Sequence, residues 1–541
     1  MEPRARYVIA AALLLVLIGI GFRVWRLDGS VFSSDEAVAT QHVAGISERD
    51  VIAAFSKRDG VRAHEAGAFA LGGSPRGPRD VVATLAAEDP QHPPLFYVLA
   101  HGWRAFFGSS IAASRALPAL LGLLGIAAAG ALCALVTRSA IGGWSGAALF
   151  ALSPFQVVYA QEVREYSLFA TLTLLSTALL IASLRRPTVL LLVAYAAASV
   201  AGLYTFTMFL LVLAAHGTIL VLRRPERGTV RRVALAMVAA VVCWIPWIAI
   251  LVERRGLIAS TNDWSGVRWS PLALAAKWLF NGATSFFDLT YLDARWAPAS
   301  LMVLFVLALA LFALRRAAPD ARAVVVSLML WSFGSLALID LAGGGHRSTV
   351  ARYVVPAFCA LTVAVAAWVS VAWSAKRPAL ALGSALALCL AGIVSLSVRS
   401  THTVWWDNAK EGGIPSIAAA IDSARLPVLV TNVNWPIMAN LARYARTDPS
   451  FVLVDTDRVA VALAAKGRAF VVTTSPASRH ALEANTTLRA RAVFVSSTTS
   501  APVALFRRRM LAEQRSAQDD AAVDDAGATL FLVGAPPLAH R

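Results

Sequence analysis

The sequence predicts a polytopic α-helical membrane protein with a small α/β domain outside the membrane. Of its 541 residues, 58% are hydrophobic and only 15% are charged, whereas a soluble domain of this size would need far more polar surface. Apolar runs long enough to cross about 30 Å of hydrocarbon as a helix recur through the first 400 residues. After residue 400 the apolar runs become short or alternate with polar residues, which is typical of strands.

Eleven apolar segments are expected to span the membrane. The first follows Arg4 and Arg6, and no small-residue cleavage site comes after it, so we interpret it as a retained span and not as a signal peptide. The apolar run over 188–222 is too long for one span and is divided at Tyr204–Thr207. The expected spans are residues 7–22, 112–136, 139–158, 166–184, 188–203, 206–222, 233–252, 298–314, 323–341, 351–373 and 378–397.

Positive charges between the spans set the expected topology. The formal charge is +17, and Arg and Lys gather in the short loops that follow residues 136, 184, 222, 314 and 373. This pattern is typical of cytoplasmic loops facing anionic lipid, so nucleic-acid binding is not needed to explain the charge. We therefore expect a cytoplasmic N-terminus and, from the Ala- and Arg-rich composition, a bacterial inner membrane. The loops expected outside are 23–111, 159–165, around 203–206, 253–297, 342–350 and the chain after about 398.

One short apolar stretch, Pro93–Gly108, is expected not to cross the membrane. It contains His101 and Arg104, and a full span here would reverse the side of every later loop. We expect a helix that is embedded in the outer membrane surface or lies on it.

Two domains are predicted. Residues 1–400 form a membrane domain, in which 23–111 is a long first outer loop with interfacial helices, and 401–541 form an α/β domain outside the membrane. Residues 512–527 are polar and acidic and are expected to be a flexible insertion. The four cysteines are interpreted as packing residues because they lie in apolar segments. The expected strands are Pro427–Thr431, Phe451–Val454, Ala469–Thr473, Ala492–Val495 and Leu530–Val533, and the expected helices are Pro415–Ala424 and Val459–Lys466.

Two carboxylates open the first outer loop. Asp35 and Glu36 follow the first span, at the expected membrane surface, where a partly desolvated carboxylate is a stronger base. A base in this place suits proton removal from a hydroxyl nucleophile, and a carboxylate pair also suits cation coordination. The structural alternative is that Asp35 caps a helix and that Glu36 is a first-turn anion opposing the helix dipole.

A second polar group precedes the short helix. The prolines Pro93 and Pro94 favour an extended entry into that helix, which would let Gln91 and His92 point into an interfacial site. The structural alternative is that the prolines only begin the helix and that His92 is solvated.

A third polar group lies in the connection between the third and fourth spans. Glu162, Arg164, Glu165 and Tyr166 stand there, on the same side as Asp35. Charges at such depth are costly unless they are paired or functional. A local network among the two glutamates and the arginine is the structural alternative.

A glycine-rich turn introduces the fourth group. His346 and Arg347 follow it, and then Arg352 and Tyr353. Guanidinium groups match phosphate oxygens, so these cations suit an anionic phosphate, although Arg352 with Tyr353 also resembles an interfacial anchor. All four groups fall on the outer side in a topology derived without them. The sequence therefore predicts a single outer-facing site with a base, phosphate-binding cations and access from the lipid.

The order of these motifs resembles that of the GT-C membrane glycosyltransferases. Within that class the chain is similar to the family of protein O-mannosyltransferases, bacterial aminoarabinose transferases and rhizobial lipopolysaccharide-core transferases. The resemblance covers roughly residues 7–400. It is carried by Asp35–Glu36, His92–Tyr97, Ser114–Pro118, Tyr159–Leu168 and Arg352–Pro356.

The resemblance implies a polyprenyl- or dolichyl-phosphate sugar donor, transfer with inversion, and an outer-face glycan, lipid or protein acceptor. It implies that Asp35 is the base or orients the acceptor, that Glu162 or Glu165 is a second acid, and that Arg352 lies near the donor phosphate. Gln91 and His92 stand where aminoarabinose transferases have Glu-Lys, which leaves any metal or phosphate role there open. No cofactor is implied with certainty, and a divalent metal is left open.

Two other functions compete with a glycosyltransferase. A solute or lipid transporter would place charges and broken helices near the midplane, usually with internal repeats, whereas the expected spans are nearly free of charge. A non-catalytic relative that only binds polyprenyl lipid would keep the same motifs. The sugar, the acceptor and the oligomeric state are not specified by the sequence.

Overall fold

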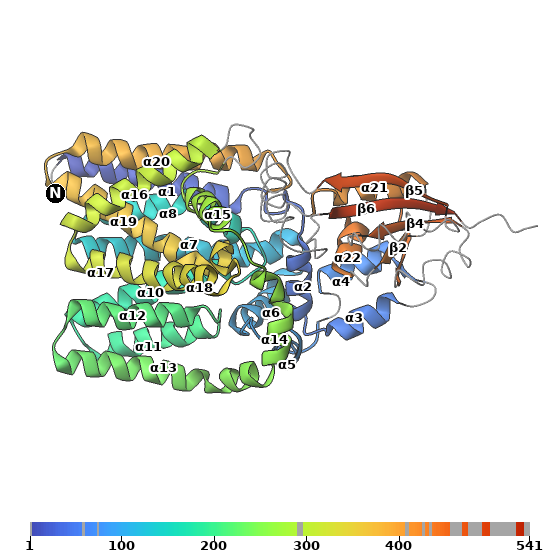
Figure 1. The fold of residues 1–541 in the computed structure, drawn as a ribbon, viewed down its shortest axis with the longest axis horizontal. Helices are drawn as coiled ribbons and strands as arrows, with labels where there is room; N and C mark the ends of the chain where they lie inside the picture. The colour runs from blue at the N-terminus through green and yellow to red at the C-terminus, as the bar shows by residue number, and fades with distance from the viewer. Residues whose placement is uncertain are drawn as a thin grey trace, which may run out of the picture. The chain divides into compact units, whose positions relative to one another are not determined.

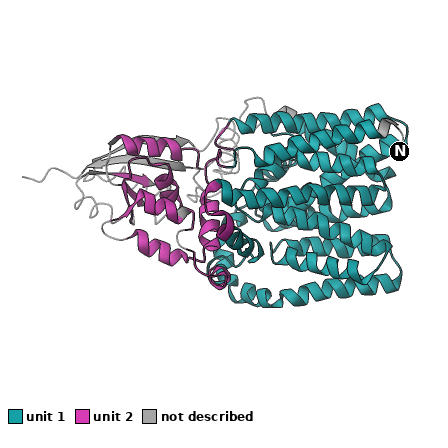
Figure 2. Ribbon diagram, turned by 180° about the vertical axis from the view of Figure 1, so that it is seen from behind, with its two compact units in different colours: residues 1–27, 85–103, 112–401 teal, residues 28–84, 104–111, 402–541 magenta. Residues whose placement is uncertain are grey.

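The computed structural model describes residues 3–56, 60–72, 75–288, 296–405, 411–424, 428–431, 435–454, 468–473, 489–497 and 526–534. The chain forms two compact units (Figure 2). The first unit contains residues 1–27, 85–103 and 112–401, and the second contains residues 28–84, 104–111 and 402–541.

The first unit is helical, and its long helices lie side by side (Figure 1). Among the helices that are long and apolar enough to span a membrane, α19 is the most buried, and α8, α16, α17 and α20 pack around it. The helices are α1 (Pro3–Val24), α6 (Leu95–Phe107, whose last turn belongs to the second unit), α7 (Ile111–Thr137), α8 (Ala140–Ala151), α9 (Pro154–Ala160), α10 (Tyr166–Arg185), α11 (Val189–Leu203), α12 (Phe209–Arg223), α13 (Arg227–Glu253), α14 (Arg255–Thr261), α15 (Pro271–Thr284), α16 (Trp296–Arg316), α17 (Pro319–Leu328), α18 (Ser335–Gly343), α19 (Val355–Ser374) and α20 (Pro378–Ser400).

The expected spans agree with these helices. Each of the eleven segments coincides with one helix or with consecutive helices, and Pro93–Gly108 is the separate helix α6. Among the described residues, seven helices are long and apolar enough to cross a membrane, or eight if the bent pair α8–α9 is one span. The chain is a multi-pass α-helical membrane protein, and eleven crossings stay a prediction. Cys133, Cys359 and Cys389 are buried as expected, but Cys243 is exposed on α13, so the packing role predicted for it is wrong.

The bend of 59° between α8 and α9 has a local cause. Ser153 caps α9, accepting from the backbone N–H of Gln156, and Pro154 follows at the first helical position. Two other helices approach this break closely: α1 at Gly19 and α20 at Gly392. A Cβ atom added at Gly19 of α1 would lie 2.5 Å from the carbonyl oxygen of Ala151, so only glycine allows this approach.

An ion cluster joins the expected cytoplasmic ends of three helices. Asp320, in the first turn of α17, accepts from Arg185 at the end of α10 and from Arg223 at the end of α12, each at 2.6 Å. Because Asp320 is largely buried, a carboxylate without these partners would be costly there.

The second unit is an α/β structure around a six-stranded sheet. Strand order is β1-β3-β2-β4-β6-β5, with β3, β2 and β4 parallel and the other pairs antiparallel. The elements are α2 (Ser34–Val43), α3 (Glu48–Phe55), β1 (Val61–Arg62), α4 (Ala63–Ala70), α5 (Pro78–Glu88, whose last turn belongs to the first unit), α21 (Ile414–Ala424), β2 (Val428–Thr431), α22 (Trp435–Tyr444), β3 (Ser450–Val454), β4 (Arg468–Thr473), β5 (Arg489–Ser497) and β6 (Ala526–Gly534).

The second unit contains residues 28–84 in addition to 402–541, whereas the sequence analysis placed residues 28–84 with the membrane domain. The reason is that β1 pairs with β3 and that α2 and α4 pack against α22. All five expected strands and the helix at 415–424 are present, whereas β1 and α22 were not predicted. The expected helix Val459–Lys466 and residues 512–525 lie outside the described residues, and Ala526 and Gly527 begin β6.

Replacing Gly19 by alanine should destabilise the membrane unit. The new methyl group would meet the Ala151 carbonyl group at 2.5–2.7 Å, and overpacking of this kind costs about 1–3 kcal/mol. Gly21→Ala on the same helix is the matched control, because a Cβ atom there meets nothing within 4 Å. Thermal unfolding of the purified protein in detergent checks this; equal unfolding temperatures for the two variants would contradict the close approach of α1 and α8.

Candidate active site

The turn at residues 89–94, between α5 and α6, is held by two other parts of the first unit. Trp247 of α13 donates from its indole nitrogen to the carbonyl oxygen of Pro90 at 3.0 Å, and the Thr207 hydroxyl donates to the carbonyl oxygen of Gln91 at 3.3 Å. These bonds satisfy carbonyl groups that no helix pairs. They place the side chain of His92 at the start of α6.

The connection 161–165, between α9 and α10, faces this turn. Its two ends are tied together by the Ser167 hydroxyl, which donates to the carbonyl oxygen of Tyr159 at 3.1 Å. Within it, the backbone N–H of Arg164 donates to the carbonyl oxygen of Glu162 at 2.7 Å. Glu165 stands directly before α10 as its N-terminal flanking residue, where a carboxylate is favoured by the helix dipole.

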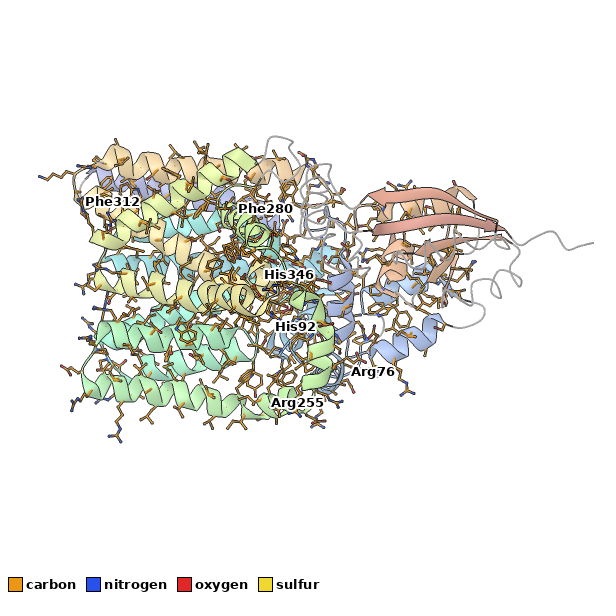
Figure 3. The ribbon with its side chains drawn as sticks, in the orientation of Figure 1. Arg76, His92, Arg255, Phe280, Phe312 and His346 are labelled. Atoms are coloured by element: carbon orange, nitrogen blue, oxygen red, sulfur yellow. The ribbon has the colours of Figure 1, made fainter. Side chains whose placement is uncertain are left out.

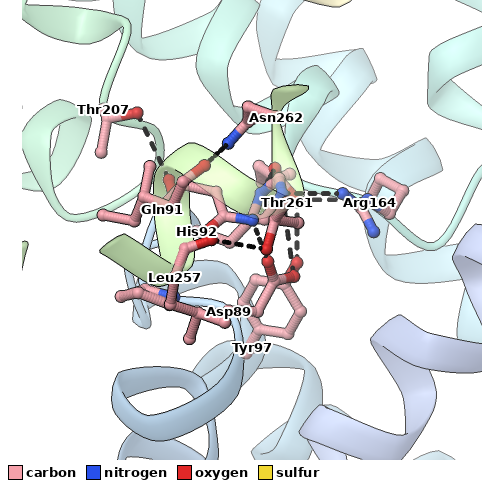
Figure 4. Close-up of polar contacts among 12 residues, drawn as sticks. Asp89, Gln91, His92, Tyr97, Arg164, Thr207, Leu257, Thr261 and Asn262 are labelled. Atoms are coloured by element: carbon pink, nitrogen blue, oxygen red, sulfur yellow. Dashed lines mark hydrogen bonds and ion pairs between the residues drawn. The ribbon is translucent and has the colours of Figure 1, made fainter. Parts of the chain in front are cut away.

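The buried carboxylate of Glu165 is the centre of a polar cluster that includes His92, Tyr97 and Arg164. These three side chains are labelled in Figure 4. His92 donates from Nδ1 to Glu165 Oε1 at 2.6 Å, and the Tyr97 hydroxyl donates to Oε2 at 3.3 Å. Arg164 Nε lies 3.6 Å from the same Oε2, and Arg164 Nη2 donates to the Tyr166 hydroxyl at 3.1 Å. The carboxylate of Glu165 contacts His92; whether Glu162 or Glu165 is the second acid stays a prediction.

The second imidazole nitrogen of His92 faces two further groups. Arg164 Nη2 lies 3.2 Å from Nε2, and Asp89 Oδ2 lies 3.8 Å from it. The Gln91 amide nitrogen donates to the other oxygen of Asp89, so Gln91 orients this carboxylate and lies in the same cluster as His92. The solvated role considered for His92 is wrong, because its side chain is only 12% exposed and is bonded on both ring nitrogens.

Opposing effects act on the pKa of Glu165. Burial alone would raise the pKa, but His92 and Arg164 stabilise the charged form and lower the pKa from 4.5 to about 2. Burial raises the pKa of the Tyr97 hydroxyl well above its ordinary value, so this group stays protonated and donates. Glu165 is therefore a permanent anion at neutral pH and a weak base.

Phe206 joins the polar cluster to the Arg352–Tyr353 group. Its ring stacks on the imidazole of His92 with centroids 5.9 Å apart, and it contacts the rings of Tyr166 at 5.8 Å and Tyr353 at 6.2 Å. The side chain is almost fully buried. Sequence reasoning missed Phe206; its only signal was the interruption at 204–207, which was used to divide an apolar run.

Arg352 lies between aromatic faces. Its guanidinium carbon is 5.8 Å from the ring centroid of Trp264 and 5.6 Å from that of Tyr353, and the Tyr353 hydroxyl donates to Asn262 Oδ1 at 3.3 Å. His346 stacks on Trp269 with centroids 4.6 Å apart. The structure thus brings Arg352, Tyr353 and His346 into one aromatic and cationic group with Trp264, Trp269 and Asn262.

Arg347 has a carboxylate partner. Asp340, at the end of α18, lies 3.6 Å from Arg347 Nη1 and also accepts from the backbone N–H and hydroxyl of Ser348 at 2.6 Å each. The charge of Arg347 is therefore partly balanced within the protein.

Asp35 and Glu36 lie in the second unit, at the start of α2. Ser33, and not Asp35, is the N-cap, and Glu36 completes a capping box by accepting from the backbone N–H of Ser33 at 3.0 Å. Ser34 donates its backbone N–H to the buried Glu411 at 2.9 Å. Glu36 is buried and has the structural role considered for it, whereas Asp35 is half-buried in the first turn and takes no part in the cap.

Across the part of the chain that the structure describes, no group of three or more His, Cys, Asp or Glu side chains could hold a metal ion.

Glu165→Gln should lower the stability at neutral pH by about 3 kcal/mol, because it removes a buried negative charge that contacts both His92 and Arg164. The pKa of Glu165 is lowered on folding, so its contribution is complete above pH 4.5 and is lost as the pH falls toward 2. The difference between wild type and variant should therefore narrow over that range. Unfolding in detergent at a series of pH values measures this, and a difference that stays constant down to pH 2 would refute the lowered pKa.

No protein-family model and no curated protein matches the chain. Among solved structures it is similar to ArnT from Cupriavidus metallidurans bound to undecaprenyl phosphate, with 16% identity, a TM-score of 0.47, and coverage of 98% of this chain and 97% of that one. It is also similar to an Archaeoglobus fulgidus oligosaccharyltransferase in complex with Zn and sulfate (12% identity, TM-score 0.43, coverage 86% and 67%). A third is the arabinofuranosyltransferase AftD from Mycobacteria (14%, 0.44, coverage 99% and 40%). At such identities and TM-scores these similarities assign neither an activity nor a ligand to this chain.

Proposed function

We propose that the chain is a GT-C type glycosyltransferase that transfers a sugar from a polyprenyl-phosphate donor to an acceptor on the extracytoplasmic side of the membrane. The observation that carries the proposal is the buried His92–Glu165–Arg164 cluster, placed where several apolar helices end, with Arg352 in an aromatic setting beside it through Phe206 and Tyr353. A lipid-linked phosphate needs two things from its binding protein. Apolar helices contact the hydrocarbon chain of the lipid, and cations at the ends of these helices bind the phosphate.

Arg164 and Arg352 are the groups that we assign to the donor phosphate. Arg164 donates to the Tyr166 hydroxyl, and the guanidinium group of Arg352 lies over the ring of Tyr353. The rings of Tyr166 and Tyr353 both contact Phe206, so the two arginines belong to one region. Two guanidinium groups near a leaving phosphate stabilise the charge that grows on its oxygens as the glycosidic bond breaks.

Asp35 is the group that we assign to proton transfer. The acceptor hydroxyl oxygen forms a bond to the anomeric carbon from the side opposite the phosphate, the carbon–oxygen bond to phosphate breaks, and the hydroxyl proton passes to the Asp35 carboxylate. The configuration at the anomeric carbon is inverted, and polyprenyl phosphate leaves with the electrons of the broken bond. Glu165, with a pKa of about 2, is too weak a base for this step and instead orients His92 and Arg164.

Asp35→Asn should abolish transfer while leaving donor binding intact, since loss of a general base costs about 100-fold or more in rate. The assay uses purified protein in nanodiscs with a panel of radiolabelled polyprenyl-phosphate sugars. Asp28→Asn is the matched control, because Asp28 is an exposed carboxylate of the same loop. Tight donor binding without turnover, identical in wild type and Asp35→Asn, would show a lipid-binding protein or transporter instead.

Arg352→Ala should raise the KM for the donor about tenfold or more, because a charge-assisted hydrogen bond to phosphate is worth about 1.5–3 kcal/mol. The matched control is Arg255→Ala, on the exposed helix α14 (Figure 3). Initial rates over a range of donor concentrations separate KM from kcat. An equal rise in KM for both variants would mean that Arg352 contributes only to the general positive charge of the surface.

A further inference from the structure

The side-chain amide of Gln161 joins the ends of two helices to the candidate site. It lies directly after α9, and its Nε2 donates to the carbonyl oxygens of Phe22 at 2.8 Å, Arg23 at 3.2 Å and Trp25 at 3.1 Å. These carbonyl groups belong to the last turn of α1 and the residue after it, where a helix leaves its acceptors unpaired. Gln161 thus satisfies the end of α1.

The oxygen of the same amide is bonded to a different helix. Arg399, in the last turn of α20, donates from Nη1 to Gln161 Oε1 at 2.6 Å. Only one orientation of the amide presents its oxygen to the guanidinium and its nitrogen to the carbonyl groups, so the contacts on both sides define it. The side chain is 7% exposed.

Two further hydrogen bonds join α1 to the end of α8, which directly precedes α9. Arg23 of α1 donates from Nη2 to the carbonyl oxygen of Phe150 at 2.8 Å and from Nη1 to that of Ala151, at the end of α8. α1 therefore caps α8, and the residue after α9 caps α1. A shift of Gln161 relative to α1 would break the hydrogen bonds that its amide makes at the end of α1.

The connection that begins at Gln161 ends at Glu165, whose carboxylate holds His92 at 2.6 Å. We infer that Gln161, oriented by Arg399, is a positioning residue that sets the Glu165 carboxylate against His92. It acts through the four-residue backbone path of the connection and not by touching either side chain. The inference concerns the geometry of the site; its kinetic consequence rests on the function proposed above.

A double-mutant cycle tests the inference without reference to activity. The coupling between His92→Gln and Glu165→Gln is measured from unfolding by a denaturing detergent, first in the wild type and then in a Gln161→Met background. Gln161→Met keeps the length of the side chain and adds no charge near Glu165. We expect the coupling to weaken about tenfold in the unfolding equilibrium constant. A coupling unchanged by Gln161→Met would overturn the inference.

Two further backgrounds make the cycle specific. Arg399→Met should weaken the coupling in the same direction, since it releases the amide oxygen, and it replaces Gln161→Met if that variant does not fold. Asp320→Asn is the matched control, because it loosens the opposite end of α10, about 30 Å from Glu165, and should leave the coupling intact. Equal weakening in the Asp320→Asn background would show general loosening and would overturn the inference.

Steady-state kinetics of the Gln161→Met variant separate this inference from the proposed function. If both hold, Gln161→Met lowers kcat about 100-fold, the effect of a misplacement of about 1 Å, and changes the donor KM little. If the coupling weakens but no protein, including the wild type, turns over any donor, the positioning role stands and the proposed function fails.

Discussion

The structure depends on one rule of the bilayer: in hydrocarbon, every backbone N–H and C=O group must find a partner within the protein. Helices satisfy this rule along their length but not in their first and last turns. Where the helices end, side chains must therefore supply the missing bonds, as Gln161 does for α1, Arg23 for α8 and Trp247 for the turn before α6. Polar side chains collect at these ends for that reason, and the candidate site lies among them.

Burial then separates the roles of the carboxylates. Glu165 is fully buried and contacts the imidazole of His92 and the guanidinium of Arg164. These two groups stabilise its charge and lower its pKa to about 2. Glu36 also bonds within the protein, because it closes the capping box of α2. Asp35 sits beside Glu36 in the same first turn but is only half-buried and takes no part in the cap. Of these two neighbouring carboxylates, Asp35 is therefore the one that is more accessible to solvent.

Much of the fold could be predicted, because spanning length and apolar composition are local properties. The elements that were missed depend on distant partners. β1 has only two residues and exists because β3 lies beside it. Residues 28–84 read as a loop of the membrane domain, yet they belong to the unit of the sheet, since α2 and α4 pack against α22. Exposure of Cys243 has the same origin: an apolar neighbourhood in sequence does not say whether a side chain faces protein or lipid.

The residues of the candidate site also differ in how readily the sequence reveals them. A charge in an apolar chain is conspicuous, so His92, Arg164, Glu165 and Arg352 could be named from their types and from the expected side of the membrane. Phe206 carries no such signal, because one more aromatic residue in an apolar run is ordinary; its role appears only when it meets the ring of His92. A buried charge restricts the residue type at its own position. A contact that orients another side chain depends instead on the shape and hydrogen bonding of two segments that are distant in the sequence. Many residue types can make such a contact, so the sequence alone does not reveal it.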